Sequence, residues 1–450
     1  NIHDLSSPVN DDSSSRKKAY FSEASPLIHQ IESNKTNSIL PAFLSSSGTS
    51  FITPADEYDQ VYWSFWLLGA AFLIPWDSML SVESYWSLQI QPKALFSFSI
   101  SYMMTNLLGL VVVVAVGQRV SSAIRILPGL VVFVLVLVAL LFLKKGDSTI
   151  YIANVLMGLM GTMDAIVQGS TYGLAGQFHP RFINAVMAGN GIAGIVISVV
   201  QITILLILPA VDNPSDAQKL ERQTTMVRAF FGACGFVIVL TILAYIFILR
   251  RSPVTRYYLN KSKDERTDYV TGGDSGDAQQ SSFMTIFKQV FIQGLNALLV
   301  FLVTLTLYPA LASLIQPVAY PSDGKIPFFV ILVTIFNTFD FIGRSLPRFD
   351  ALVVVSPRFL IIPVLARFVF IPLFLFGGKI AHATNSDLPT YAIMALFALS
   401  NGYLGTLAMM FGPAKCRPAD KETAGTIMVF LLTCGLTAGV WCGKLIDAVK

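Results

Sequence analysis

Residues 182–211 read FINAVMAGNGIAGIVISVVQITILLILPAV and contain no charged side chain. The hydrocarbon core of a bilayer is ~30 Å thick, and a helix that rises 1.5 Å per residue crosses it in about 20 residues. This stretch is therefore long enough and apolar enough to span a membrane as one helix.

Three glycines in this stretch, Gly189, Gly191 and Gly194, match the G-x-G-x-x-G spacing of dinucleotide-binding loops. Such a loop needs a preceding strand, a helix that opens at the glycines, and an acidic residue about 20 positions further on. None of these features surrounds the glycines. Ala185, Gly189 and Ala193 instead recur every four residues, a pattern that lets two helix backbones approach closely. We therefore interpret the glycines as a helix-packing surface.

The whole composition is that of a membrane protein. Of 450 residues, 54% are hydrophobic and 13% are charged, whereas globular chains carry about 25% charged residues. Counting runs of membrane-spanning length with few or no charges predicts an all-α polytopic membrane protein with eleven transmembrane helices. The expected spans are 62–82, 94–117, 126–143, 149–178, 182–211, 229–249, 289–318, 326–346, 359–378, 388–414 and 423–443.

Two polar segments divide the chain. Residues 1–61 are too polar to bury a core and contain no signal peptide, so we expect a disordered cytosolic tail. Residues 251–283 include TGGDSGDAQQSS, which is typical of a flexible linker. The linker separates a bundle of six helices (62–250) from a bundle of five (284–450).

The loops on the side of the tail carry more Lys and Arg than those on the other side, including Arg125, Arg181 and Arg348. The positive-inside rule then places the N-terminus in the cytosol. The net charge of +4 reflects this bias and indicates no nucleic-acid partner. We expect a monomer in contact with membrane lipid.

Four cysteines are scattered without a CxxC pair or a nearby histidine, so we expect no disulfide framework, no metal site and no cofactor. They are Cys234, Cys416, Cys434 and Cys442.

Few charges lie inside the spans, where each costs ~2.5–3.5 kcal/mol on insertion scales. In FNTFDFIGRSL, the residues Asn337, Asp340 and Arg344 share one helical face, with the acid four residues before the arginine. They form either a structural ion pair that also ties in Arg367, or a polar wall that lines a solute cavity. The spacing alone leaves both interpretations open.

Two further spans contain polar or aromatic groups at membrane depth. In FLIPWDSML, Pro75 interrupts the first span beside Trp76, whose ring either stacks on a flat solute or packs in the core. In the fourth span, Gln168 follows Asp164 by four residues. Its amide is able to bond a heterocyclic base or a neighbouring helix.

Several motifs occur in a specific order. The first span carries IPWDSML, the fourth QGSTYGLAG, the fifth AGNGIAG, the eighth FNTFDFIGRSL, and the last two LSNGYLGTL and MFGPAKCRPADKETAG. From about Tyr62 to the C-terminus, the chain resembles the equilibrative nucleoside transporters. That resemblance implies a major-facilitator-like fold, with six helices packed against five around a central cavity that opens alternately to each side.

The resemblance also implies roles for individual residues. Leu73 and Trp76 would border the base of a nucleoside, and Gln168 would bond it. Asn337, Asp340 and Arg344 would meet the ribose. The function implied is nucleoside transport without enzymatic chemistry, either facilitative or proton-coupled, with nucleobases as further substrates.

The chain departs from the family at two acids. Asp77 stands where the family usually has Asn, and Asp164 stands where a small residue is common. Extra carboxyls in an apolar cavity are candidate proton-binding sites. These acids keep open the alternative that the chain carries nucleobases or organic cations. A nucleoside-sensing receptor is the rival from another class of protein.

The tail contains a candidate address signal. Glu23, Leu27 and Ile28 fit an acidic dileucine motif that sorting adaptors read. It predicts a lysosomal, vacuolar or endosomal membrane about as strongly as the plasma membrane.

Overall fold

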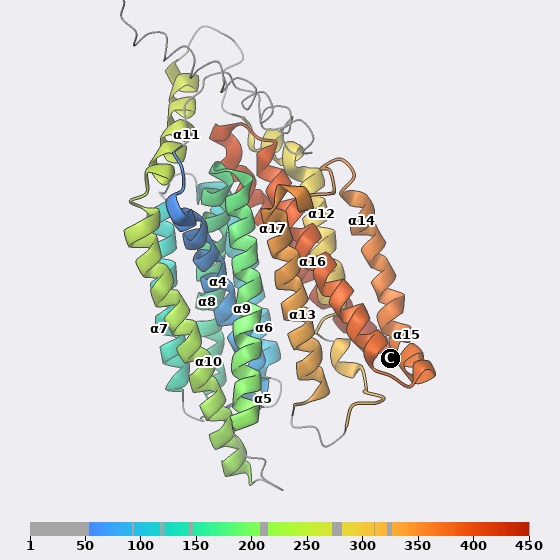
Figure 1. Ribbon diagram of the computed structural model, residues 1–450. Helices are drawn as coiled ribbons and strands as arrows, with labels where there is room; N and C mark the ends of the chain where they lie inside the picture. The colour runs from blue at the N-terminus through green and yellow to red at the C-terminus, as the bar shows by residue number, and fades with distance from the viewer. Residues whose placement is uncertain are drawn as a thin grey trace, which may run out of the picture. The chain divides into compact units, whose positions relative to one another are not determined.

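The fold is all-helical throughout the described part of the chain (Figure 1). The described helices belong to one compact unit. The residues that the computed structural model describes are 54–91, 94–117, 120, 122–143, 146, 148–207, 215–271, 281–309, 311–321 and 326–449. The sorting motif at Glu23, Leu27 and Ile28 lies outside these ranges.

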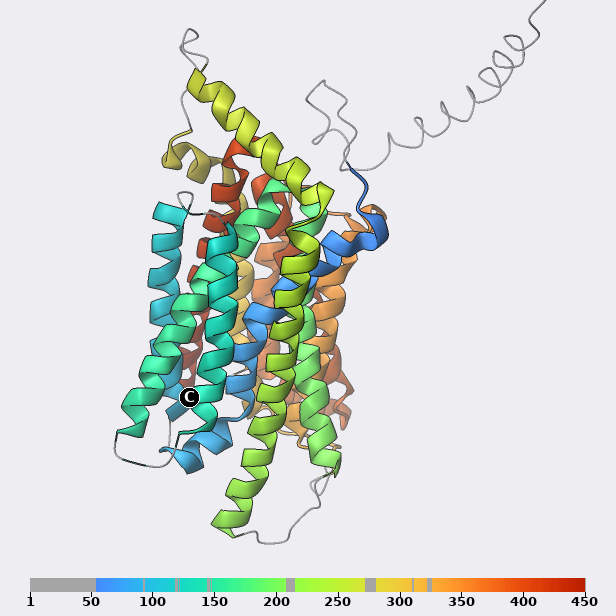
Figure 2. The ribbon, with the colours of Figure 1, turned by 90° about the vertical axis from the view of Figure 1, so that its left-hand side faces the viewer.

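A first group of helices comes from the part of the chain before the polar linker. Within it, α4 packs on α9 and α10, while α6 and α7 pack on α8. Figure 2 shows this group facing the viewer, with α10 running along the length of the bundle. The bounds are α4 Gln60–Ser81, α5 Glu83–Gln89, α6 Ala94–Val116, α7 Ser122–Leu141, α8 Thr149–Gln177, α9 Pro180–Ile207 and α10 Asp216–Ala244, which continues as η4 Tyr245–Leu249; the short turn η2 Glu57–Asp59 precedes α4.

A second group follows the linker. In this group, α12 packs on α16 and α17, and α13 and α15 pack on α16. The bounds are α12 Phe283–Leu307, η5 Ala312–Leu314, α13 Phe328–Ser345, η6 Leu346–Arg348, η7 Asp350–Leu352, α14 Ile361–Ala366, η8 Arg367–Val369, α15 Phe370–Thr384, α16 Leu388–Ala414, η9 Pro418–Asp420 and α17 Lys421–Val449.

The described helices agree with a membrane-spanning chain. Nine are long and apolar enough to cross a bilayer, and the bent pair Glu57–Ser81 and Glu83–Gln89 brings the number to ten. The span expected at 359–378 forms α14, η8 and α15, and the apolar helix Ile361–Phe376 within it is counted apart from the nine. The count of eleven therefore stays a prediction.

Several boundaries differ from the expected spans. Helix α10 begins at Asp216, well before residue 229, because Ser215 and Gln218 form a reciprocal capping box at its start. Helix α12 ends at Leu307 rather than at 318, just before Pro309. A proline lacks the N–H that would continue the helix.

The polar segment after α10 is not a linker over its whole length. Residues Pro253–Thr271 form α11, where the composition predicts flexible chain. Val254, Thr255 and Ser262 are buried on one side of this helix. Tyr258 stacks on Phe178 at the end of α8, with ring centroids 4.8 Å apart.

The small residues of α9 pack against a neighbouring helix backbone, as predicted from their spacing. A Cβ on Gly189 would lie 1.9 Å from the backbone oxygen of Trp66 in α4, and a Cβ on Gly69 would lie 2.1 Å from that of Val186. The backbones of α4 and α9 therefore lie in direct contact where they cross, because neither glycine has a side chain to hold them apart.

We expect Gly189→Ala to lower the melting temperature of the purified protein by several degrees, because the clash is with backbone and the helices must separate, at a cost of ~1–3 kcal/mol. Gly232→Ala in α10 is the matched control, since nothing lies within 4 Å of the added Cβ. Equal melting temperatures for the two variants would contradict the close crossing.

Candidate functional site

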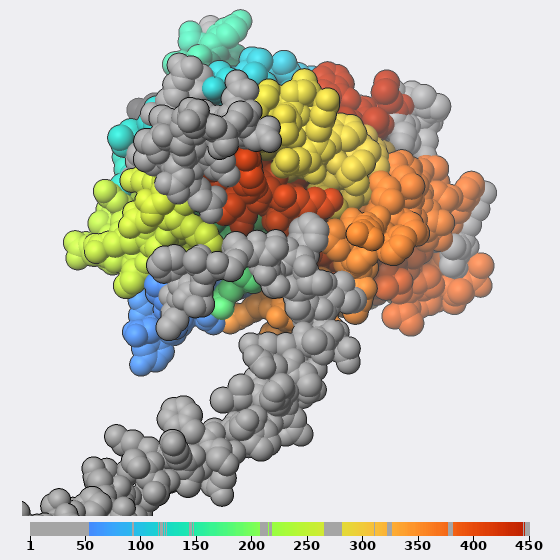
Figure 3. Space-filling model, turned by 90° about the horizontal axis from the view of Figure 1, so that it is seen from above, coloured from blue at the N-terminus to red at the C-terminus, as the bar shows by residue number. Residues whose placement is uncertain are grey.

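The two groups of helices meet along α9 with α13 and along α8 with α17. We call the end of the bundle at which α4 begins the tail face; it is uppermost in Figure 1. Figure 3 views this face and shows the start of α17 lying between α11 and α12.

The centre of the site is an ion pair in α13. Arg344 Nε donates to Asp340 Oδ2 at 2.6 Å, and both side chains are 8% exposed. The terminal nitrogens of Arg344 make no hydrogen bond to any described residue, and its guanidinium carbon lies 5.9 Å from the ring centroid of Phe301. The arginine therefore keeps donors for a further polar group.

The second oxygen of Asp340 is held by α16. Asn401 Nδ2 donates to Asp340 Oδ1 at 2.7 Å, and Thr304 Oγ1 of α12 donates to Asn401 Oδ1 at 2.6 Å. Arg367 Nη2 then donates to Thr304 Oγ1 at 2.8 Å. Arg367 thus reaches Asp340 through two intervening side chains and does not contact it directly.

Glycine allows α13 and α16 to come close enough for these bonds. A Cβ on Gly402 would lie 2.1 Å from the backbone oxygen of Asp340, and one on Gly343 would lie 2.3 Å from that of Leu399. Since Asn401 precedes Gly402, this crossing places its amide against Asp340.

Asn337 faces the first group of helices. Its Nδ2 donates to Gly194 O at 3.0 Å and to Ser198 Oγ at 2.9 Å, both in α9. About two turns towards the tail face, Asn184 Nδ2 donates to Arg344 O at 2.7 Å. The helix with the ion pair is therefore bonded to α9 on both sides of Asp340.

The aromatic side of the site belongs to α4 and α6. Trp76 stacks on Tyr102 with ring centroids 4.2 Å apart and an interplanar angle of 14°. Tyr102 donates its hydroxyl to Asp164 Oδ2 at 2.7 Å, and Asn106 Nδ2 donates to the same oxygen at 2.7 Å. Asp164 is 5% exposed, and its Oδ1 is buried without a partner in the described part of the chain.

Three other predicted site residues have side chains that form no hydrogen bond with a described residue. Leu73 and Asp77 are partly exposed on α4, and the amide of Gln168, 7% exposed, makes no hydrogen bond to a described residue. Asp77 lies within electrostatic range of Arg344 and Asp340. The structure therefore brings Asp77 near the ion pair, whereas Asp164 is bonded between α6 and α8.

Two ion pairs join the groups at the tail face. Arg348 Nη2 at the end of α13 lies 2.9 Å from Asp59 Oδ2, and Arg181 contacts the other oxygen of Asp59. Arg125 Nη2 of α7 lies 2.6 Å from Glu422 Oε1 of α17, with the two side chains 8% and 12% exposed. These contacts link the two groups of helices at the tail face.

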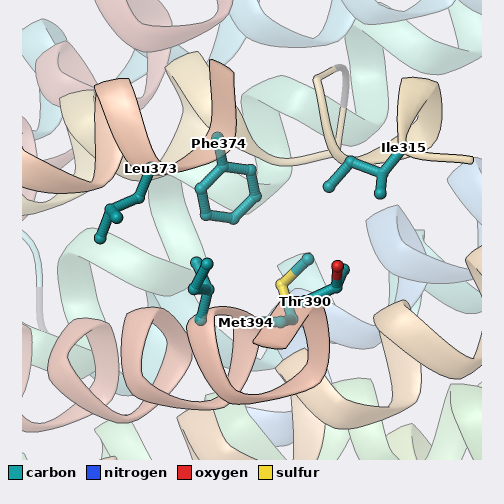
Figure 4. Close-up of a pocket in the computed structure, with 6 residues that line it drawn as sticks. Ile315, Leu373, Phe374, Thr390 and Met394 are labelled. Atoms are coloured by element: carbon teal, nitrogen blue, oxygen red, sulfur yellow. The ribbon is translucent and has the colours of Figure 1, made fainter. Parts of the chain in front are cut away.

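A separate apolar pocket lies between α15, α16 and the chain after α12 (Figure 4). It is lined by Ile315, Leu373, Phe374, Thr390, Ile393 and Met394. One hydroxyl among apolar side chains offers little to a polar solute, so the pocket does not compete with the ion pair as a candidate site.

Several residues of the site escaped the sequence analysis. Tyr102 and Asn106 lie four residues apart on α6, a spacing that puts both donors on one helical face. Thr304 carried no signal because a threonine in an apolar helix usually bonds its own backbone. Tyr308 lies within electrostatic range of Asp77 and Asp340, and a single tyrosine in a long apolar run carried no signal.

Residues 152–447, more than half of the chain, match the family model described as "Nucleoside transporter". The chain belongs to the nucleoside transporter family. Its relatives are carriers, so this transporter is not an enzyme. No group of three or more His, Cys, Asp or Glu side chains able to hold a metal ion occurs among its described residues.

Similar proteins span nearly the whole transporter. Equilibrative nucleoside transporter 1 of Mus musculus is 28% identical, over 88% of this chain and 98% of the relative. Equilibrative nucleotide transporter 1 of Arabidopsis thaliana is 26% identical, over 87% of each chain.

Solved structures of major facilitators share the fold. The proton:xylose symporter XylE is 13% identical with a TM-score of 0.56, covering 87% of this chain and 88% of XylE. The fucose symporter FucP in the outward conformation is 14% identical with a TM-score of 0.58, covering 86% of this chain and 91% of FucP. The predicted major-facilitator-like fold is confirmed.

Proposed function

We propose that this transporter carries nucleosides across a membrane by alternating access, with the two groups of helices rocking about the site between them. The observation that carries this proposal is the buried Asp340–Arg344 pair, in which the terminal nitrogens of Arg344 bond to no described residue. A carboxylate accepts hydrogen bonds and a guanidinium donates them. The pair therefore suits the vicinal hydroxyls of a ribose.

The other half of a nucleoside is a flat ring with polar edges. One face of the Trp76 ring is covered by Tyr102, and we propose that the other face meets the base beside Leu73. Gln168, whose amide makes no hydrogen bond to a described residue, would bond an edge of the base. Asn337 would contribute its side-chain oxygen, which accepts no hydrogen bond from a described residue, on the side of the sugar.

The ion pairs at the tail face support a state closed at that end. Arg348–Asp59 and Arg125–Glu422 both link the two groups there. Alternating access requires these contacts to break when the site opens to the tail side. We propose that the tail side is the cytosol, as the Lys and Arg bias indicates.

Purified protein in liposomes should exchange labelled uridine or adenosine for unlabelled nucleoside in a saturable manner without ATP. Hypoxanthine and a monoamine should compete poorly in the same assay, which separates the nucleoside proposal from carriage of nucleobases or organic cations. Binding without any flux would favour a receptor. No saturable flux of either nucleoside would refute the proposal.

We propose further that transport is coupled to protons through Asp164 or Asp77. No basic side chain pairs with Asp164 in the described part of the chain, and its Oδ1 has no partner. A buried carboxylate without a cation is costly, and a proton on Oδ1 would remove the charge. The arrangement gives that proton a defined atom.

If protons bind from the side on which the nucleoside is supplied, uptake into liposomes should rise when that side is made acidic. Uptake should fall when the pH gradient is reversed. Asp164→Asn and Asp77→Asn each mimic a protonated acid, so at least one should abolish this response while exchange persists. If the parent ignores the gradient, the transporter is purely facilitative.

We propose a lysosomal, vacuolar or endosomal membrane as one address, with sorting adaptors reading Glu23, Leu27 and Ile28, and a monomer as the working unit. Changing Leu27 and Ile28 to alanine should move a tagged protein to the plasma membrane. An unchanged distribution would show that the motif is coincidental.

A further inference from the structure

Arg367 is a buried cation with no acid beside it. It is 2% exposed, and no carboxylate forms an ion pair with it among the described residues. Its Nη1 donates to Ser400 Oγ at 2.8 Å and to Phe397 O at 3.3 Å, while its Nε has no partner. Burial of an unpaired charge is costly and invites a functional reason.

The bonds that lead from Arg367 to Asp340 run in one direction only. An arginine only donates and a carboxylate only accepts. Asn401 must therefore turn its NH₂ towards Asp340 and its oxygen towards Thr304, whose one hydroxyl proton is offered to that oxygen at 2.6 Å and to Val300 O at 2.8 Å. The same hydroxyl then accepts from Arg367. The chemistry of Arg367 and Asp340 fixes the two end links, and the shorter distance favours Asn401 over Val300 as the acceptor of the hydroxyl proton.

We propose that Arg367 is a positioning residue for the substrate, acting through Thr304 and Asn401 on Asp340 Oδ1. This inference rests on the proposed contact between Asp340 and the ribose. Hydrogen bonds in a chain polarise one another, so the positive charge of Arg367 strengthens the Asn401 bond to Oδ1. That bond and the Arg344 bond to Oδ2 hold the carboxylate from both sides and aim its remaining lone pairs.

The chain crosses four elements of the second group. Arg367 lies at the start of η8, Thr304 on α12, Asn401 on α16 and Asp340 on α13. The three hydrogen bonds that link these residues all lie within the second group. A movement of the broken span relative to α12 would therefore change the aim of Asp340 without breaking the Asp340–Arg344 pair.

Thr304→Val tests the chain because it keeps the shape of the side chain and removes the hydroxyl. We expect the half-saturation concentration for uridine to rise about tenfold, the effect of losing a charge-assisted hydrogen bond. Inhibition by 2′,3′-dideoxyuridine, which lacks both hydroxyls, should stay as in the parent. The maximal rate per folded protein should also stay near that of the parent.

Two variants provide controls. Thr304→Ser keeps a hydroxyl and should restore the affinity for uridine. Thr306→Val removes a buried hydroxyl of the same helix that bonds only its own backbone, at Leu302 O, and should leave that affinity unchanged. If Thr304→Val is unstable, Arg367→Lys should show the same selective loss, since one ammonium point cannot replace the guanidinium at both hydroxyls.

The outcomes separate the chain from the function that it serves. A parent that binds uridine and its dideoxy analogue equally would refute the ribose contact, and the positioning role with it. A parent that prefers uridine, with Thr304→Val losing both ligands equally or losing only maximal rate, would make Arg367 a structural strut and overturn this inference alone.

Discussion

Asp340→Ala or Arg344→Ala alone is expected to abolish nucleoside uptake. Each change strands one charge of a pair whose side chains are 8% exposed, and breaking a buried pair in this way costs ~3–5 kcal/mol. That free energy corresponds to a loss of roughly two to four orders of magnitude. Uptake in whole cells, divided by the amount of protein at the membrane, measures the effect.

Asp350→Ala is the matched control for this experiment, because Asp350 is an exposed acid just beyond the end of α13. It should transport as the parent does. Near-normal expression and uptake in either variant of the pair would show that Asp340 and Arg344 do not act as a unit.

Arg125→Gln is expected to open the tail face. Its partner Glu422 is 12% exposed in the ion pair. Loss of the pair should therefore shift the equilibrium between the states closed and open at the tail face by about 2 kcal/mol, or about 30-fold. A cysteine at position 426 reports this shift. Thr426 is 4% exposed and bonds Gly169 O across the two groups.

The experiment starts from a chain whose four native cysteines are replaced. In sealed vesicles, a membrane-impermeant maleimide added on the tail side should label position 426 faster in Arg125→Gln than in the parent. The double exchange Arg125→Glu with Glu422→Arg should restore slow labelling, and Arg256→Gln on the exposed side of α11 should not change it. Equal labelling in all four proteins would mean that this pair does not keep the face closed.

The i,i+4 relation of Asp340 and Arg344 could be read from the sequence because neighbouring turns of one helix fix it. The remaining partners could not be found in this way. Thr304, Arg367 and Asn401 come from three other elements, and only the crossing at Gly402 shows which of their polar atoms meet. Arg367 was correctly suspected as a neighbour, but through intermediates and not in direct contact.

The helices were predictable where they are apolar and almost uncharged. The prediction missed breaks inside an apolar run and a helix made largely of polar residues. Uncharged runs locate helices, yet they do not show breaks: the expected span at 359–378 contains Pro363 and Pro372 and forms α14, η8 and α15. Polarity likewise hid α11, although Val254, Tyr257 and Tyr258 recur at helical spacing.

The two ion pairs at the tail face differ in exposure, and this difference has a consequence for the environment of the carrier. The side chains of Asp59, Arg181 and Arg348 are 33–39% exposed, whereas those of Arg125 and Glu422 are 8% and 12% exposed. Mobile ions screen exposed charges within a Debye length of ~8 Å at physiological ionic strength and reach buried ones far less. The salt concentration on the tail side therefore weakens one contact and spares the other. In a concentrated electrolyte, the buried Arg125–Glu422 pair would stay in place while the exposed contacts of Asp59 with Arg181 and Arg348 loosen. The balance between the two orientations of the carrier would then depend on the salt concentration on the tail side.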